Sequence, residues 1–372
     1  MKCKIGIVTI DNYTNYGNRL QNFALTRLLE LEGMEVVNGV QVYTKEDYVF
    51  RSNNLIKTIA KQMIPFFYVR KIITPKPVKN IGLLKIRENR FIDFVHKYTN
   101  PIGIIVAPTH RRAAKILRQY GIEYCLTGSD QVWNPFYEGK DYEFLHFLPK
   151  NKRLSFAASI GVNNIPDNKV EQYRKSLSAM KYLSVREQRA VEIIKELTGR
   201  DADLTLDPTL LLEPEEWQKA IKKPEIVLND QYICTYFLGE VPEAVKAFAK
   251  EKELPIYVLN SQDSPDFFTL DPAEFLYMIQ NASYVLTDSF HAVAFSIKFN
   301  KEFYVFNRKQ DGVSNMFSRI ETITKRFGLE NRIQNRDRIC EQDPISNWNE
   351  IEKELASEKN RSMGKLLEAM GI

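Results

Sequence analysis

The chain has 372 residues, more than a single hydrophobic core usually serves, so its length predicts two domains. Hydrophobic residues make up 44% and charged residues 27%, which is typical of a folded globular protein and excludes a disordered one. The net charge of +5 is spread over 52 basic and 47 acidic residues, which argues against a nucleic-acid partner and suits an anionic small substrate.

Neither a secretory signal nor a metal site is predicted. The N-terminal segment MKCKIGIVTI has too short an apolar run for a signal peptide, and no stretch approaches the roughly 20 apolar residues that span a bilayer. The four cysteines are widely separated, which favours neither disulfides nor a zinc site. We therefore expect a cytoplasmic protein without a bound metal.

The chain opens with a strand, a polar loop and a helix. KIGIVTI is a β-branched run, residues 11–18 form a loop rich in amides and phenols, and apolar residues then recur at helical spacing up to Gly33. A second strand, EVVNGVQV, completes a βαβ unit. Ligands bind beyond the carboxyl ends of such strands, so the loop residues Asn15, Gly17 and Asn18 are candidate substrate-binding positions. The loop lacks G-x-G-x-x-G, and its side chains suit sugar hydroxyls better than a dinucleotide.

Residues 53–80 interrupt this alternation with a basic, aromatic-rich segment that ends near two prolines. Two interpretations stay open. The segment is either an insertion packed on its own domain or a helix that lies on an anionic membrane surface.

A second polar motif, GSDQVWNP, follows the strand-like run IEYCLT. Its candidate binding residues are Gly128, Ser129, Asp130, Gln131 and Trp133. At a sheet's carboxyl edge they would face a ligand, with the tryptophan stacked on a sugar ring or a base. The alternative is a strand-to-helix cap with a buried tryptophan whose indole N–H finds a carbonyl. RLSFAASIG then completes a first domain, 1–167, with its insertion at 53–80.

From residue 168 a second series of strands and helices begins, and we assign 168–343 to a second doubly wound domain. Residues 344–372 form an amphipathic helix that packs back on the first domain. Arg186 in YLSVRE ends a predicted strand and can hold a carboxylate or phosphate in a bidentate fork, unless it only pairs with a neighbouring glutamate. Asp207 in LDPTLLL is as well explained by a turn as by a binding role.

The motif TDSFHAVAFSI follows the strand NASYVL and places a histidine at a helix start. Asp288 and Ser289 are expected to cap this helix, and His291 falls in its first turn. Unpaired N–H groups and the helix dipole favour an anion there. A histidine can donate to a phosphate oxygen or transfer a proton near neutral pH. The alternative is that Asp288 caps a core helix and His291 fills a gap.

Six stretches together resemble one family, the polysaccharide pyruvyl transferases: KIGIVTIDNYTNYGNRLQNFAL, GSDQVWNP, RLSFAASIG, YLSVRE, LDPTLLL and TDSFHAVAFSIKF. The resemblance implies an α/β fold, GT-B-like, with two Rossmann-type doubly wound domains facing a central cleft. It implies phosphoenolpyruvate as donor, with no further cofactor, and a saccharide as acceptor. Donor and acceptor would be joined as a pyruvate ketal in polysaccharide or cell-envelope glycan biosynthesis. His291 and Arg186 match donor-site residues of the family, and we expect them to be catalytic.

The chain departs from the family at one donor-site position. Where better understood members resemble Arg-Leu-His, this chain has Ser289, Phe290 and His291, so one arginine is missing. Three cations are candidates to compensate for it: Lys298, Arg308 and Lys309.

Two other functions remain open from sequence: a GT-B glycosyltransferase that uses a sugar nucleotide, and a carbohydrate-binding member of the family without catalysis. If the acceptor is linked to a lipid diphosphate, residues 53–80 would bring the protein to the inner face of the membrane.

Overall fold

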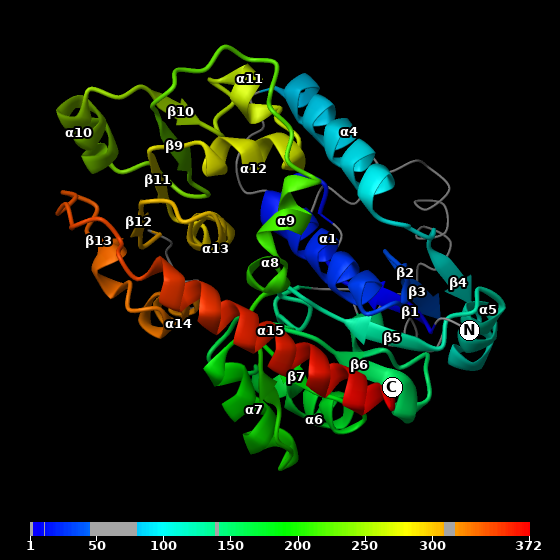
Figure 1. Ribbon diagram of the computed structural model, residues 1–372. Helices are drawn as coiled ribbons and strands as arrows, with labels where there is room; N and C mark the ends of the chain where they lie inside the picture. Colours follow the sequence, from blue (N-terminus) through cyan, green and yellow to red (C-terminus); the bar gives the residue numbers. More distant parts are fainter. Residues whose placement is uncertain (1–2, 11, 45–79, 138–140, 309–316) are drawn as a thin grey trace.

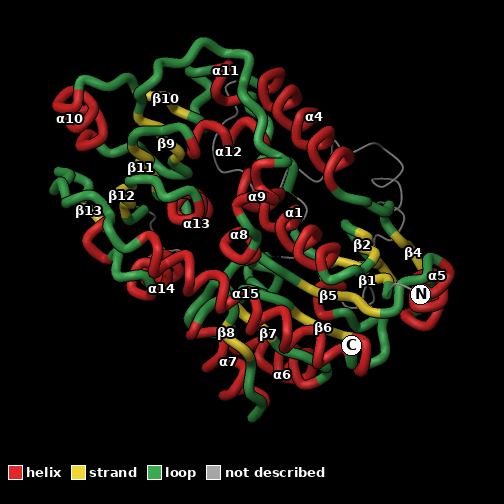
Figure 2. The backbone as a smooth tube through the Cα atoms, in the orientation of Figure 1, coloured by secondary structure: helices red, strands yellow, loops and turns green. Residues whose placement is uncertain are grey.

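The computed structural model describes residues 3–10, 12–44, 80–137, 141–308 and 317–372. The predicted insertion, 53–80, lies outside these ranges except for its last residue, so its two interpretations stay predictions. Helices flank two separate groups of parallel strands (Figures 1 and 2). This arrangement confirms the predicted α/β class with two Rossmann-type units.

The first unit is built around a parallel sheet in the order β2-β1-β5-β6. Its strands are β1 (Lys4–Val8), β2 (Glu35–Val37), β5 (Tyr124–Thr127) and β6 (Arg153–Ser155). β1 is apolar and buried along most of its length, as expected of a strand covered on both faces. A separate parallel pair, β3 (Val42–Thr44) and β4 (Ile105–Ala107), lies nearby with the helices α4 (Ile81–Tyr98) and α5 (His110–Gln119).

The first unit is larger than the sequence predicts. β7 (Ser184–Val185) pairs with β8 (Asp203–Leu204), and single bridges from Leu154 to Tyr182 and from Ala158 to Val185 join β7 to the edge of the first sheet. The helices α6 (Val170–Ser178) and α7 (Gln188–Thr198) bury apolar residues in the same core as β1 and β5. Residues 170–204 therefore belong with the first sheet, and the predicted boundary at 168 is too early.

The second unit contains a five-stranded parallel sheet in the order β10-β9-β11-β12-β13. Its strands are β9 (Ile233–Tyr236), β10 (Ile256–Val258), β11 (Tyr284–Thr287), β12 (Phe303–Phe306) and β13 (Ile333–Gln334). Its helices are α10 (Glu243–Lys252), α11 (Pro265–Phe268), α12 (Pro272–Gln280), α13 (Phe290–Lys298) and α14 (Ser318–Arg326). Two short helices, α8 (Pro208–Leu211) and α9 (Pro214–Gln218), connect the units.

The helix α1 (Tyr16–Leu31) joins the two units through a shared core. Its Tyr16 ring stacks on Phe275 of α12 with centroids 4.2 Å apart, and its Phe23 ring lies 5.3 Å from Trp217 of α9. A helix with apolar contacts on several faces is a buried one, and α1 is buried over most of its length. Its first turn is therefore fixed relative to both sheets.

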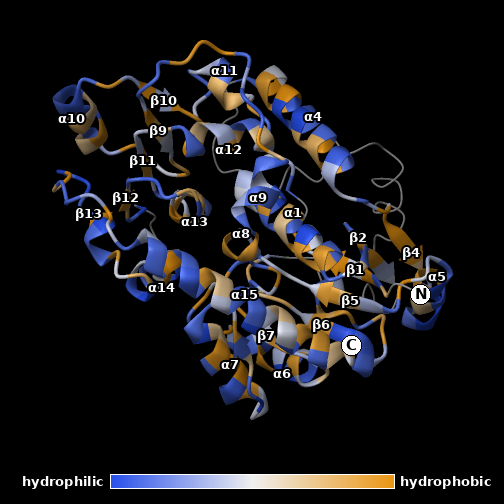
Figure 3. Ribbon diagram, in the orientation of Figure 1, coloured by the Kyte–Doolittle hydropathy of each residue, from blue (hydrophilic) through white to orange (hydrophobic). Residues whose placement is uncertain are grey.

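The C-terminal helix α15 (Trp348–Met370) starts beside α14 and runs to the first unit (Figure 1). Arg326 pairs with Glu354 near its start, and the hydroxyl of Tyr124 donates to the carbonyl of Met370 at its end. Both α4 and α15 alternate between hydrophobic and hydrophilic residues, as expected of helices with one buried side (Figure 3). Among the described helices, none combines the length and apolar character needed to cross a membrane.

Candidate active site

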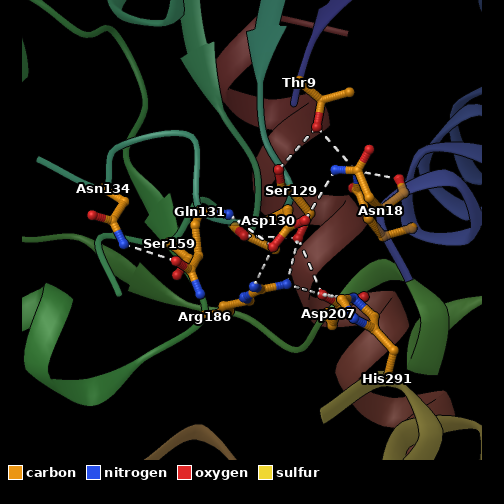
Figure 4. Close-up of polar contacts among 12 residues, drawn as sticks. Thr9, Asn18, Ser129, Asp130, Gln131, Asn134, Ser159, Arg186, Asp207 and His291 are labelled. Carbon is orange, nitrogen blue, oxygen red and sulfur yellow. Dashed lines mark hydrogen bonds and ion pairs between the residues drawn. The ribbon is translucent and has the colours of Figure 1, made fainter. Parts of the chain in front are cut away.

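The strand order reverses once in each sheet, and the predicted motifs lie at these two points. In the first sheet β1 lies between β2 and β5, and in the second β9 lies between β10 and β11. Open α/β sheets bind ligands at such reversal points, beyond the carboxyl ends of the strands. Residues that follow β1, β5, β7 and β11 come together there (Figure 4).

The turn after β5 is built for a close approach of two backbones. Gly128 has φ +119°, and a Cβ on it would lie 2.3 Å from the carbonyl oxygen of Phe156, so only glycine fits. Ser129 donates through its hydroxyl to the carbonyl of Ala157 at 2.9 Å. Asp130 follows in a left-handed conformation, with φ 68°, and accepts a 3.0 Å hydrogen bond from the side chain of Asn18. The turn thus links the end of β5 to the start of α1.

Arg186, just after β7, is the centre of a buried ion-pair network. Its guanidinium binds a side-chain oxygen of Asp207 and, at 2.9 Å, Oδ1 of Asp130 (Figure 4). Glu187 is a third carboxylate, 3.7 Å from Nε of Arg186. Arg186 thus lies beside two other predicted site residues, and its role in binding or catalysis stays a prediction. Its fork, however, already holds two carboxylates of the protein, which suits a residue that positions Asp130 and Asp207.

The charges in this network stabilise one another. Burial alone would raise the pKa of Asp207, but the adjacent Arg186 outweighs it, and the pKa lies below its ordinary value. Burial would likewise raise the pKa of Asp130, but Arg186 outweighs it and the pKa is lowered. Burial alone would lower the pKa of Arg186, and Asp207 and Asp130 raise it instead. All three groups are therefore charged at neutral pH.

His291 lies in the first turn of α13, as predicted, and closes the site from the second unit. Its Nε2 is 3.8 Å from Oδ2 of Asp207, beyond hydrogen-bond distance, and this buried nitrogen has no hydrogen-bond partner. Burial, the largest effect, lowers the pKa of His291 below its usual value, although Asp207 and Asp130 act in the opposite direction. The imidazole is therefore neutral near pH 7, with one nitrogen available to a ligand.

Gly17 lies against the His291 ring across the boundary between the units. A Cβ on Gly17 would be 2.0 Å from Nδ1 of His291, far inside van der Waals contact. The first turn of α1 therefore fixes the position of the imidazole, and only glycine allows this approach. The prediction that Gly17 belongs to the site is explained by this contact rather than by contact with a substrate.

We expect Gly17→Ala to destabilise the protein by about 1–3 kcal/mol, because the new methyl group must displace the His291 ring. Gly364→Ala in α15 is the matched control, since a Cβ there meets nothing within 4 Å, and a helical Gly-to-Ala change is stabilising by up to about 1 kcal/mol. Urea denaturation compares the two variants, and the ring NMR signals of His291 report its displacement. Equal stabilities with an unmoved ring would contradict the contact.

Two charged residues of the site were missed by sequence reasoning. Glu187 is buried, with Oε1 bound by the hydroxyl of Ser159 and Oε2 without a partner. Arg319 of α14 has a buried Nε without a partner, and its guanidinium lies 5.6 Å from the centre of the Phe290 ring. Glu187 could have been noticed as a second charge after a strand, but Arg319 stands in an ordinary amphipathic helix pattern, FSRIETITKR.

Several predicted binding residues have structural partners instead. Trp133 is 1% exposed and donates from its indole to the carbonyl of Glu143 at 3.3 Å, so the predicted stacking on a ligand is wrong and the buried alternative is confirmed. Asp288 does not cap α13, because its oxygens accept from the backbone N–H groups of Leu238 and Gly239. Ser289 is the N-cap residue of α13, but its side chain makes no cap hydrogen bond.

The remaining predicted residues support the site from the side. Asn15 caps α1 by accepting from the N–H of Asn18 at 3.1 Å, and Gln131 accepts from Asn134 at 2.8 Å. Asp207 also caps α8, since it accepts from the N–H of Thr209 at 3.0 Å. A hydrogen bond within its own turn thus fixes the side chain of each of these residues.

Two of the three cations considered as replacements for the missing arginine have other partners. Lys298 lies at the far end of α13 from His291, where its ammonium donates to the carbonyl of Leu210 and burial lowers its pKa to about 8. Arg308 pairs with Asp288 at 3.1 Å. Lys309 lies outside the described residues. In the described part of the chain, no group of three or more His, Cys, Asp or Glu residues is arranged to hold a metal ion.

Solved structures that are similar to this chain include the following three. The S. aureus MnaA–UDP co-structure has 10% sequence identity and a TM-score of 0.47, and the match covers 100% of this chain and 91% of that one. UDP-GlcNAc 2-epimerase from Neisseria meningitidis, bound to UDP-GlcNAc, has 7% identity and a TM-score of 0.45, and the match covers 99% of both chains. The glycosyltransferase SnogD from Streptomyces nogalater has 9% identity and a TM-score of 0.43, and the match covers 99% of this chain and 100% of that one. No curated protein sequence matches this chain significantly.

A sequence model of one family does match. The polysaccharide pyruvyl transferase model aligns with residues 15–310, which include every predicted site motif from the first turn of α1 to α13. Because this match spans most of the 372 residues, the chain belongs to the polysaccharide pyruvyl transferase family.

Proposed function

We propose that this protein transfers the enolpyruvyl group of phosphoenolpyruvate to a saccharide and closes it as a pyruvate ketal, in the synthesis of a polysaccharide or cell-envelope glycan. Family membership supports the reaction class. The observation that carries the proposal is the buried, unpartnered Nε2 of His291 in the first turn of a helix. A proton-transfer group at an anion-binding helix start is what a phosphorylated enol donor requires.

The proposed reaction begins at the enol carbon C3. A general acid protonates C3, C2 becomes oxocarbenium-like, and one saccharide hydroxyl attacks C2 and loses its proton. The bond from C2 to the phosphate oxygen then breaks, and phosphate leaves. A second hydroxyl attacks C2 and gives up its proton, which closes the ketal. The products are one pyruvate ketal and one phosphate, and no cofactor is consumed.

His291 is the proposed proton-transfer residue. Its imidazole is neutral in the free protein because burial lowers its pKa. A phosphate dianion bound beside Nε2 would raise that pKa and favour the protonated ring, which can then act as an acid or hold the phosphate. The unpaired N–H groups at the start of α13 would stabilise the charge that develops on the departing phosphate.

Arg186 is retained in the proposal as a positioning residue. It holds Asp207 and Asp130 in place, and Asp207 in turn lies next to Nε2 of His291. A carboxylate beside an imidazole favours its protonated form and fixes its orientation. The network of Arg186, Asp207 and Asp130 therefore influences the protonation state of His291.

The saccharide acceptor would bind at the edge formed by GSDQVWNP. Trp133 is buried, but Phe136 directly after this motif is 66% exposed and offers an aromatic face to a sugar ring. The lipid-diphosphate-linked form of the acceptor, with residues 53–80 at the inner face of the membrane, rests on sequence alone. Liposome sedimentation that is unchanged after deletion of residues 60–75 would exclude the membrane contact of this segment.

The proposal is tested by incubating the protein with phosphoenolpyruvate and candidate saccharides, and by measuring both phosphate release and the mass of the product. A saccharide that gains a ketal-linked pyruvate, with one phosphate released per product, supports it. A product that instead gains a sugar from a sugar nucleotide contradicts it and identifies a glycosyltransferase. Saccharide binding without any phosphate release also contradicts it and identifies a non-catalytic member.

A further inference from the structure

We propose that Arg319 is the residue that binds the donor's anionic group, in a site formed with His291 and the start of α13. The identification of that anion as part of phosphoenolpyruvate rests on the function proposed above. The anion site itself does not rest on that function, because it is inferred from the charges and contacts of the described residues.

Arg319 lacks a direct ion pair, because Glu187 and Asp130 attract its guanidinium only from beyond ion-pair distance. Among the described residues no carboxylate pairs with it, and its Nε is buried without a hydrogen-bond partner. Two fully buried arginines differ from this half-buried one, since Arg332 pairs with Glu302 at 2.8 Å and Arg186 pairs with two aspartates. A buried N–H donor without a partner is costly, and a guanidinium cannot lose its proton to avoid that cost. An arginine without a direct ion pair therefore favours binding of an anion from outside.

A second arginine increases the demand for an anion. The guanidinium carbons of Arg186 and Arg319 lie 5.2 and 5.6 Å from the centre of the same ring, that of Phe290. Burial, followed by the charge of Arg186, lowers the pKa of Arg319. The guanidinium of Arg186 already binds Asp207 and Asp130, whereas Nε of Arg319 has no partner, so Arg319 is the arginine that can still bind a ligand.

The position of Phe290 locates the anion. Phe290 is the first residue of α13, so the Arg319 guanidinium lies over the side chain of the residue that begins this helix, where backbone N–H groups lack intrahelical partners. His291 follows directly, with its unpartnered Nε2. A cation, a helix N-terminus and an imidazole thus converge from two helices, α13 and α14.

The chemistry of these groups selects a phosphate or a carboxylate. A guanidinium offers a planar fork of N–H donors that binds two oxygens of either group at once. A neutral saccharide would leave Arg319 without a direct ion pair. The site therefore takes the donor rather than the acceptor.

The test compares the variants Arg319→Gln and Arg319→Lys with Lys325→Gln, which removes an exposed charge from the same helix. Calorimetric titration of the full chain uses two probes, inorganic phosphate and phosphoenolpyruvate. We expect Arg319→Gln to weaken binding of both by roughly tenfold to a hundredfold, because charge-assisted hydrogen bonds are lost. Arg319→Lys keeps the charge without the fork and should weaken phosphoenolpyruvate binding by roughly fivefold to tenfold. Lys325→Gln should bind like wild type.

Thermal unfolding gives a readout that a structural role would not produce. Without an anion, Arg319→Gln should melt close to wild type, because Arg319 makes no direct ion pair that the substitution could remove. Added phosphate should raise the melting temperature of wild type and of Lys325→Gln, but not that of Arg319→Gln.

Phosphate or phosphoenolpyruvate binding that is unchanged in Arg319→Gln would overturn the proposal, as would a wild-type protein that binds neither probe. If Arg319→Gln does not fold, Arg319→Lys is the variant that tests the proposal. An affinity of Arg319→Lys for phosphoenolpyruvate equal to that of wild type would overturn the proposed contact. Anion binding that depends on Arg319, in a protein that forms no ketal, would support the site and contradict the proposed function.

Discussion

We expect His291→Ala to slow ketal formation by roughly 10²–10⁴-fold, the usual contribution of one proton-transfer residue. The physical reason is that Nε2 of His291 is the unpartnered imidazole nitrogen of the site, held near Asp207 on one side and against Gly17 on the other. No hydrogen bond of the folded state is lost at that nitrogen, so the effect should fall on the rate. Phosphate release under saturating donor and acceptor measures it.

His96→Ala is the control for this prediction. His96 is exposed on α4, so its removal changes the histidine content of the protein without touching the site. It should retain the wild-type rate. A His291→Ala variant with full activity would show that proton transfer is carried by another group, and would remove the observation on which the proposed function depends.

The second large effect is on stability. We expect Arg186→Met to lower the free energy of unfolding by about 3–5 kcal/mol, because the buried carboxylates of Asp207 and Asp130 lose their counter-charge. Arg189→Met is the matched control three residues away. Arg189 pairs with Glu192 and Glu196 at the surface, where an ion pair contributes about 0–1 kcal/mol. Urea denaturation at pH 7 compares both variants with wild type.

The pH dependence separates this explanation from a simple loss of packing. In the folded protein the pKa values of Asp130 and Asp207 are below their ordinary values, so their stabilising effect is complete at neutral pH and is lost as the pH falls through the folded-state values. The difference in stability between wild type and Arg186→Met should therefore shrink in acid. A difference that stays constant from neutral to acid pH would attribute the loss to packing instead.

The fold class was predictable because it depends on local patterns. Apolar runs such as those of β9 and β11 alternate with helical spacing, and this alternation requires parallel strands with helices between them. The boundary between the units was not predictable in the same way. β7 has two residues, and whether it extends the first sheet or the second depends on its bridges to Leu154 and Ala158, which the local pattern does not contain.

The sequence by itself determined the positions from which the site is built. Asn15 before α1 is fixed by a cap and the turn at Gly128 by a glycine conformation, and both act over a few residues and can be recognised in one stretch. Parallel strands then bring such ends to one edge of a sheet. This is why the amino-acid pattern alone is enough to predict that His291 and Asp130 each lie at the carboxyl edge of a sheet.

Only the tertiary structure decided which side chains remain available in that site. Arg186 is bound by Asp207 and Asp130, and Trp133 is buried. Arg319 lies on α14, and its Nε has no hydrogen-bond partner. These outcomes depend on contacts between segments far apart in the chain, and on the cost of burying each charge, which is set by all the neighbours of a residue rather than by those beside it in sequence. The availability of Arg319 to a ligand is therefore a property of the packed molecule.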